Sequence, residues 1–174
     1  MIYVIGCCHF DDDSIIGHRR FKSTEEMNLL MAENWKRVVS DDDMVYVLGD
    51  FSLKRPSYWQ ERLPGKKILI LGNHDTFQTK NAGFAEVRDS VLLRERDGRE
   101  VITCWLSHYP YLSWPERSEG CVHLHAHCHG NSTHSLRGFP GPWRLDMSSE
   151  IWNYTPVNLL QAVEAAKTRM AGSY

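Results

Sequence analysis

The chain has 174 residues, of which 42% are hydrophobic and 24% charged, and its net charge at neutral pH is −2. This length fits one domain spanning residues 1–174, and the composition excludes a fibrous repeat or a disordered chain. The lack of a basic excess argues against a dedicated nucleic-acid-binding protein. The N-terminal apolar run, residues 2–5, is too short for a signal-peptide core, and no run approaches the roughly 20 apolar residues of a membrane span. We therefore expect a soluble, cytoplasmic protein.

The first half of the chain alternates predicted strands and helices. Ser23 and Glu26 form a capping-box pattern, and the apolar residues that follow have helical spacing, which predicts a helix over residues 24–39. A shorter helix is predicted around residues 57–63. Short apolar runs predict three buried strands: residues 1–6, 44–48 and 67–71. This order favours βαβ units on a largely parallel sheet.

The second half adds an antiparallel pair, loops and a last helix. Residues 92–96 and 100–106 flank Asp97 and Gly98, which is the sequence of a hairpin turn. Asn158 can cap a C-terminal helix, whose apolar face is expected to carry Leu159, Leu160, Val163 and Ala166. Two segments rich in Pro, Gly and Ser predict loops: residues 110–120 and 130–142.

Polar residues directly follow the three predicted strands of the first half. They are His9 after the first strand, Asp50 after the second, and Asn73, His74 and Asp75 after the third. In open α/β sheets ligands bind at the carboxyl ends of the strands, so we expect these side chains to converge on one site. Taken singly, the Gly-Asp and Gly-Asn-His-Asp sequences also fit a turn or a helix cap.

Histidines mark the second half of the chain. His108 ends another predicted strand, and four further histidines alternate in the next segment: His123, His125, His127 and His129. Period-two alternation places the imidazoles of an extended segment on one face. Neighbouring imidazoles on one face can reach one ion or two adjacent ions, which favours metal binding here.

Taken in this order, the clusters resemble the calcineurin-like metallophosphoesterases, and most closely the small bacterial and phage members. The family pattern is D-x-H, G-D, G-N-H-D or G-N-H-E, a His, and G-H-x-H. Here it reads Cys7-Cys8-His9, Gly49-Asp50, Gly72-Asn73-His74-Asp75, Ser107-His108 and Ala126-His127-Cys128-His129. The resemblance runs from residue 2 to about residue 157. It implies an α/β fold in which two mixed β-sheets are flanked by helices.

The resemblance also implies two divalent metal ions, of manganese, zinc or iron. Such a pair acidifies a bound water to hydroxide and neutralises charge on the phosphoryl group. His74 is then the expected general acid, and Asp75 either orients its imidazole or caps a helix. The implied ligands are Cys7, His9, Asp50 and His129 for one ion, and Asp50, Asn73, His108 and His127 for the other.

Cys7 stands where the family has aspartate. A thiolate at this position can be a metal ligand, and its soft sulfur favours zinc or iron over manganese or magnesium. Alternatively, Cys7 is a buried structural thiol, and the protein is a catalytically attenuated metal- or nucleotide-binding protein. A third reading is a thiol or metal sensor built on Cys7, Cys8, Cys128 and the histidines.

The expected substrate is a phosphodiester or phosphomonoester, because the resemblance implies a phosphoesterase. The chain has no room for a large cap domain, so the site should be open, which suits nucleotides or nucleic-acid ends. Candidates for phosphate contact are Arg19, Arg20, Lys54 and Arg55. Near the end of the chain, Asp146, Ser148 and Glu150 stand where similar proteins often have Asn, Gly and Asp, and they receive no role from the sequence.

Overall fold

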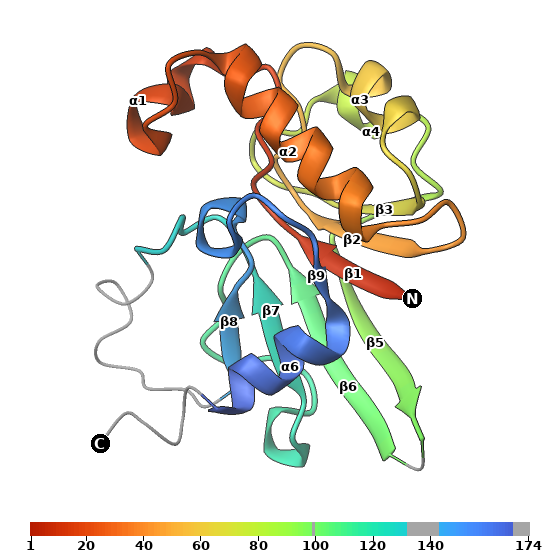
Figure 1. Ribbon diagram of the computed structural model, residues 1–174. Helices are drawn as coiled ribbons and strands as arrows, with labels where there is room; N and C mark the ends of the chain where they lie inside the picture. The colour runs from red at the N-terminus through yellow and green to blue at the C-terminus, as the bar shows by residue number, and fades with distance from the viewer. Residues whose placement is uncertain (99, 132–142, 169–174) are drawn as a thin grey trace.

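The computed structural model describes residues 1–98, 100–131 and 143–168, so most of the loop predicted at residues 130–142 lies outside the described residues. The described residues form two β-sheets that face each other (Figure 1). The first has the order β4-β3-β2-β1-β9: β4 (Glu86–Arg88), β3 (Lys66–Ile70), β2 (Met44–Leu48), β1 (Ile2–Ile5) and β9 (Val157–Asn158). The second has the order β5-β6-β7-β8: β5 (Ser90–Asp97), β6 (Glu100–Ser107), β7 (Val122–His125) and β8 (Arg144–Asp146).

Both sheets mix parallel and antiparallel pairs. In the first sheet β1 to β4 run parallel and β9 runs antiparallel to β1. In the second sheet β5 and β6 form the predicted antiparallel hairpin, while β6, β7 and β8 run parallel. The expected fold class, two mixed sheets flanked by helices, is confirmed.

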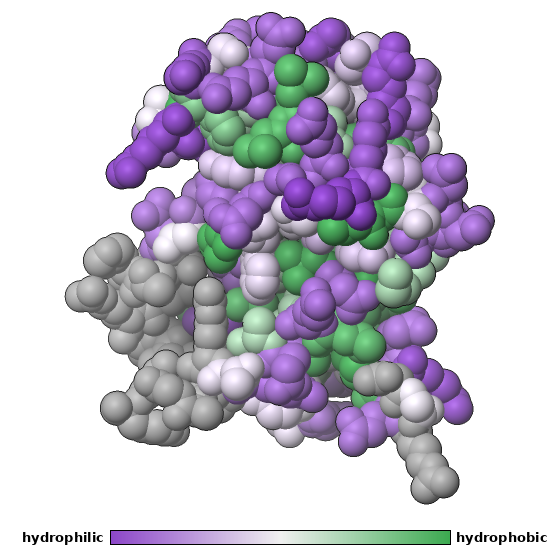
Figure 2. Space-filling model, in the orientation of Figure 1, coloured by the Kyte–Doolittle hydropathy of each residue, from purple (hydrophilic) through white to green (hydrophobic). Residues whose placement is uncertain are grey.

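Helices cover the outer face of the first sheet and one side of the second (Figure 1). The α-helices are α1 (Ile16–Arg19), α2 (Thr24–Val38), α3 (Pro56–Arg62), α4 (Phe77–Lys80) and α6 (Leu159–Thr168), and the short 3-10 turns are η1 (Asp13–Ile15), η2 (Arg117–Glu119) and η3 (Ser149–Trp152). None of the described helices has the length and apolar character needed to cross a membrane. On the face seen in Figure 2, hydrophobic residues form small patches between hydrophilic ones.

The hydrophobic core has two layers because the central strands are buried on both faces. Alternate residues of one strand point to opposite faces of a sheet. Val4 of β1 therefore packs between the two sheets with Leu124 of β7, whereas Ile5 packs on the other side against Trp35 of α2. Trp35 is fully buried, and its Nε1–H donates to the Pro64 carbonyl (3.0 Å), which fixes α2 on the sheet.

The helix ends show two local differences from expectation. Ser23 caps α2 by accepting the Glu26 N–H, but the Glu26 carboxylate accepts from the Lys22 N–H, one residue before the cap. Asn158 caps α6 through the Leu160 N–H (3.0 Å). The predicted apolar face of α6 is wrong at Leu160, which is 38% exposed, because Ala162 takes the buried position.

Candidate metal centre

The predicted ligands lie where strands of both sheets end, in backbone turns of unusual geometry. Five of them have left-handed φ angles between 48° and 68°: Cys7, His9, Asp50, His127 and His129. Such angles are uncommon for residues other than glycine and concentrate at functional sites, where the surrounding structure maintains them. The turns aim these side chains inward from β1, β2 and β7.

Asp50 occupies the middle of the site. Its Oδ2 lies 3.6 Å from His9 Nε2 and 3.5 Å from His108 Nε2. Its Oδ1 accepts the backbone N–H of His74 at 2.8 Å. One buried carboxylate oxygen therefore stands between imidazoles contributed by the two sheets.

A first group of donor atoms gathers around His108. Its Nδ1–H donates to the Leu48 carbonyl (2.8 Å), which leaves the lone pair on Nε2. That Nε2 lies 3.0 Å from Asn73 Oδ1 and 3.2 Å from His127 Nδ1. Burial, followed by the nearby His108, lowers the pKa of His127. These donor atoms belong to the second ligand set implied by the sequence.

A second group gathers around His9. Its Nδ1 is 2.9 Å from Asp12 Oδ2, which fixes the ring so that Nε2 faces Asp50. Burial, helped by the charge of Arg19, lowers the pKa of His9 to about 4, so the imidazole is neutral at pH 7. Nε2 is nevertheless buried without a hydrogen-bond partner among the described residues. A buried orphan nitrogen whose other ring nitrogen faces a carboxylate fits a metal ligand.

His129 is held by a partly buried charge pair, Arg19 and Glu150, that the sequence did not assign. Its Nδ1 lies 2.6 Å from Glu150 Oε1, and the same oxygen accepts from Arg19 Nε at 2.7 Å. Burial alone would raise the pKa of Glu150, but the His129 hydrogen bond and the Arg19 charge bring it down to about 2. Glu150 is therefore ionised when it orients His129.

Arg19 contacts other groups of this chain, rather than standing free to bind phosphate as predicted. It is only 6% exposed, and its guanidinium donates to the backbone carbonyls of Cys7 and Cys8. Lys54 pairs with Asp13, and Arg55 pairs with Asp11 through two hydrogen bonds. These three cations therefore neutralise carboxylates of this chain.

Cys7 lies at the junction of the two donor groups. Its Sγ is buried and accepts the His127 backbone N–H at 3.1 Å. It falls within 4.8 Å of ligand atoms of His9 and His129, and also within 4.8 Å of those of Asp50 and His108. Burial, and then the charge of Asp50, raises the pKa of this thiol well above its ordinary value. A nearby divalent cation reverses that balance and favours the thiolate.

The contacts of Asp75 differ from both roles predicted for it, which were to orient the His74 imidazole or to cap a helix. Its carboxylate accepts three backbone N–H groups, those of Asp50, Phe51 and Gly72, at 2.8–3.0 Å. Among the described residues it makes no hydrogen bond with the His74 imidazole, and α4 is capped by Thr76 instead. Asp75 thus ties the end of β3 to the end of β2. His74 is exposed, with its ring centroid 5.5 Å from that of His9.

The four alternating histidines do not share one face. Strand β7 ends at His125, and the left-handed residues that follow turn His127 and His129 into the centre. His123 lies elsewhere: its Nδ1–H donates to the Trp105 carbonyl (3.1 Å) and its Nε2 accepts the Tyr111 N–H (3.0 Å). Loss of strand geometry after His125 explains the difference.

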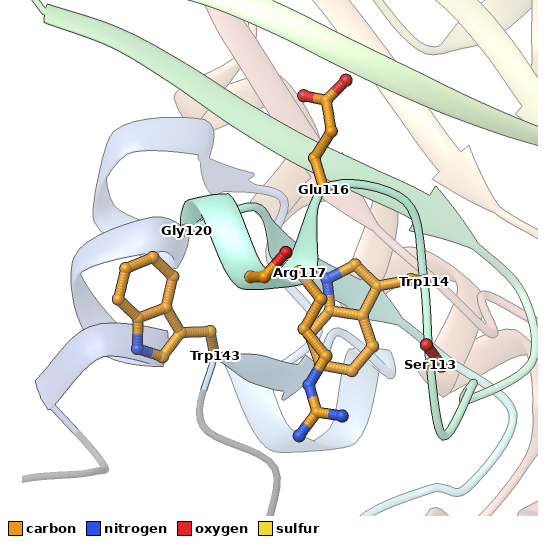
Figure 3. A pocket seen from close by; sticks show the side chains of 7 residues that line it. Ser113, Trp114, Glu116, Arg117, Gly120 and Trp143 are labelled. Atoms are coloured by element: carbon orange, nitrogen blue, oxygen red, sulfur yellow. The ribbon is translucent and has the colours of Figure 1, made fainter.

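A separate hollow of about 560 Å³ lies at the opposite end of β7, where the strand begins. Figure 3 shows the indole rings of Trp114 and Trp143 on two sides of it. Trp114 is buried, and Arg117 lies over its ring at 5.0 Å from the centroid. None of the described residues that line this hollow is a predicted metal ligand.

Comparison with known proteins identifies the family of the chain. Residues 1–166 match the calcineurin-like phosphoesterase family. The chain is 35% identical over 167 residues to an uncharacterized protein of Methanocaldococcus jannaschii, covering 91% of this chain and 86% of that protein. It is 29% identical over 157 residues to the gene 66 protein of Mycobacterium phage L5, covering 69% of this chain and 76% of that protein.

A solved structure shares the fold. It is a protein of unknown function from Aquifex aeolicus, with a TM-score of 0.72 and 24% identity, covering 95% of this chain and 98% of that one. The sequence match over residues 1–166 and the shared two-sheet architecture lead to one conclusion. The chain belongs to the calcineurin-like phosphoesterase family.

Proposed function

We propose that the protein is a metal-dependent phosphoesterase that hydrolyses phosphodiesters or phosphomonoesters at this centre. The observation that carries the proposal is the position of Asp50 Oδ2, 3.6 Å from His9 Nε2 and 3.5 Å from His108 Nε2. A carboxylate between two imidazole groups is suited to bridge two cations. We assign Cys7, His9, Asp50 and His129 to one ion, and Asp50, Asn73, His108 and His127 to the other.

The ions would be manganese, zinc or iron, and when bound they would acidify water and neutralise charge on the phosphoryl group. The chain itself supplies the proton for the leaving oxygen. His74 is suited to this role because its exposed imidazole stands at the rim while its backbone N–H is anchored to Asp50 Oδ1 (2.8 Å). Asp75 supports it indirectly by holding the turn.

The rim of the centre favours an accessible substrate such as a nucleotide or a nucleic-acid end. Asn73, His74 and His127 are all exposed. Tyr109 is 45% exposed, and its ring centroid is 4.7 Å from that of His127. An exposed ring beside the centre offers a surface on which a base can stack. A single domain and a cytoplasmic location complete the proposal.

The test is hydrolysis by metal-stripped protein under reducing conditions. Bis(p-nitrophenyl) phosphate and p-nitrophenyl phosphate are supplied in parallel, with manganese, zinc or iron(II) added separately. We expect metal-dependent turnover that Asp50→Asn abolishes and Asp13→Asn retains, because Asp13 is exposed and pairs only outside the centre. His74→Asn should lower turnover about 10²–10⁴-fold while leaving metal binding intact. Folded protein with no turnover on either ester, with any ion, would contradict the proposal.

A second candidate function is a metal- or nucleotide-binding protein with attenuated catalysis, and the presence of Cys7 in place of aspartate favours it. Under this reading Cys7→Asp raises turnover, whereas under the main proposal it mainly moves the metal preference from zinc or iron toward manganese. A thiol sensor has less support. Cys7 and Cys8 are both 0% exposed, and burial raises the pKa of each thiol, which opposes ready oxidation.

A further inference from the structure

A second cluster of metal-ligating side chains lies outside the proposed dinuclear centre. His125 ends β7, Asp146 ends β8, and Cys128 lies in the turn after β7. The potential ligand atoms of these three residues all lie within 4.8 Å of one another. His125 and Asp146 are direct neighbours across the β7–β8 pair. None of the three belongs to the dinuclear ligand set.

The His125 ring is fixed in the orientation that a ligand requires. The side chain is 2% exposed, and its Nδ1–H donates to the Ala126 carbonyl at 2.9 Å. The lone pair is therefore on Nε2, which makes no hydrogen bond with any residue that the structure describes. Metal-binding histidines commonly donate their other ring N–H to a backbone carbonyl in this way.

Asp146 supplies a buried carboxylate held from two sides. It is 3% exposed. Oδ1 accepts the Ser148 N–H (2.9 Å) and hydroxyl (2.6 Å), and Oδ2 accepts the Gly130 N–H (3.0 Å). No lysine or arginine within residues 1–98, 100–131 and 143–168 forms an ion pair with it. A buried carboxylate without a cationic partner is costly, and a bound cation would offset that cost.

Cys128 completes a ligand set of nitrogen, oxygen and sulfur and is partly exposed, so an ion can reach the cluster from solvent. Imidazole, carboxylate and thiolate together suit zinc and similar divalent transition metals. We propose that His125, Cys128 and Asp146 form a third metal site, which binds one zinc-class ion with solvent in the remaining position. Such an ion would hold the turn that carries His127 and His129 against the end of β8.

The test counts metal ions and follows the thiolate spectroscopically, without relying on hydrolysis. Cobalt(II) bound to a thiolate absorbs in the near ultraviolet, so a Cys7→Ser background removes any such signal from the dinuclear centre. In that background we expect cobalt(II) to give thiolate absorption. Adding Cys128→Ser should remove the absorption and lower bound zinc by one equivalent per chain. Cys121→Ser, which changes a thiol at the other end of β7, should leave both readouts unchanged.

Cys128 is only partly buried, so Cys128→Ser should fold, which circular dichroism would verify. His125→Gln is the second variant, and it should remove the same zinc equivalent. The proposal is overturned if the Cys7→Ser protein shows no thiolate absorption with cobalt(II). It is also overturned if absorption and zinc content persist in the Cys128→Ser double variant. A protein without phosphoesterase activity could still show the third site, so the two proposals fail separately.

Discussion

The side chain of Asp12 contacts the candidate metal centre through the His9 imidazole. Its Oδ2 lies 2.9 Å from His9 Nδ1, while its Oδ1 accepts from the backbone and hydroxyl of Ser14. The negative charge makes the His9 ring a better donor, and the hydrogen bond fixes its orientation. We therefore expect Asp12 to position His9 rather than to bind an ion itself.

We expect Asp12→Asn to weaken metal binding about 10–100-fold, because the amide keeps the turn but removes the charge. The measurement is a zinc titration against a chromophoric chelator. Asp13→Asn is the matched control, since the neighbouring Asp13 is exposed and pairs with Lys54. Equal affinities in the two variants would show that Asp12 does not tune the centre.

The sequence indicated most residues of the candidate centre but not the residues that hold them. The implied ligands follow strand ends, and that pattern is readable because the strands are short apolar runs. Glu150 has no such signal: it meets His129 and Arg19 only through folding, and Arg19 is 131 positions away. Partners brought together by tertiary contacts leave no characteristic spacing in the sequence. The sequence therefore did not reveal that Glu150 pairs with Arg19, and Arg19 stood among the candidates for phosphate contact.

At the scale of elements, the end of β3 approaches the end of β2 so closely that only glycine fits at position 72. A Cβ on Gly72 would lie 2.3 Å from Asp50 Oδ1 and 2.7 Å from the Asp50 backbone N. The Asp50 backbone N cannot move away from such a Cβ unless the turn after β2 moves with it. The turn itself is held by Asp75, so displacement of Gly72 would move the proposed bridging carboxylate.

Gly72→Ala should therefore cost about 1–3 kcal/mol of unfolding free energy and lower metal affinity at the same time. Urea denaturation and the zinc titration measure the two effects. Gly17→Ala is the control, because nothing lies within 4 Å of a Cβ there and the residue is in α1. It should be neutral or stabilise by about 0.5–1 kcal/mol. Unchanged metal affinity in Gly72→Ala would contradict the inference that Gly72 and Asp50 are packed so closely that moving one displaces the other.

Elements with a clear period were predictable, and departures from that period were not. The capped helix α2 and the hairpin of β5 and β6 follow directly from spacing and turn residues. The turn after β7 does not, because His127 and His129 take left-handed angles that no spacing in the sequence indicates. Period-two alternation therefore continued in the sequence beyond the point where the strand ended.

At the scale of the whole molecule, buried neutral histidines connect stability to pH. Burial, and then the neighbouring His125, lowers the pKa of His123 to about 3, against an ordinary value near 6.5 in the unfolded chain. Between these values the unfolded state binds more protons than the folded state. The part of the unfolding free energy that depends on a neutral His123 is therefore fully present at pH 7, and it is lost as the pH falls below about 6.5.

We expect the unfolding free energy of metal-free protein to fall on acidification between pH 6 and pH 4. His123→Gln keeps one donor and one acceptor but does not titrate, so its slope should be smaller by up to about 1.4 kcal/mol per pH unit. Urea denaturation at several pH values measures both slopes. Parallel slopes for the two proteins would mean that His123 does not contribute.

Metal binding should stabilise the entire fold, because the proposed ligands join the two sheets. His9 and Asp50 follow strands of the first sheet, whereas His108 and His127 follow strands of the second. An ion held by both groups binds the folded chain and has no preformed site in the unfolded one. At 100 times its dissociation constant, each ion should add about 2.7 kcal/mol to the unfolding free energy.

This gain corresponds to a rise in melting temperature of roughly 5–10 °C per ion for a chain of this size. Calorimetry with zinc or manganese, before and after chelation, measures it. Asp50→Asn should lose most of the rise and Asp13→Asn should keep it, because Asp50, unlike Asp13, lies between the two donor groups. If the wild-type protein binds metal with no change in melting temperature, the ligands do not join the sheets. Equal binding to the folded and unfolded chains would be the remaining explanation, and it contradicts a centre whose proposed ligands follow five different strands and are brought together only by folding.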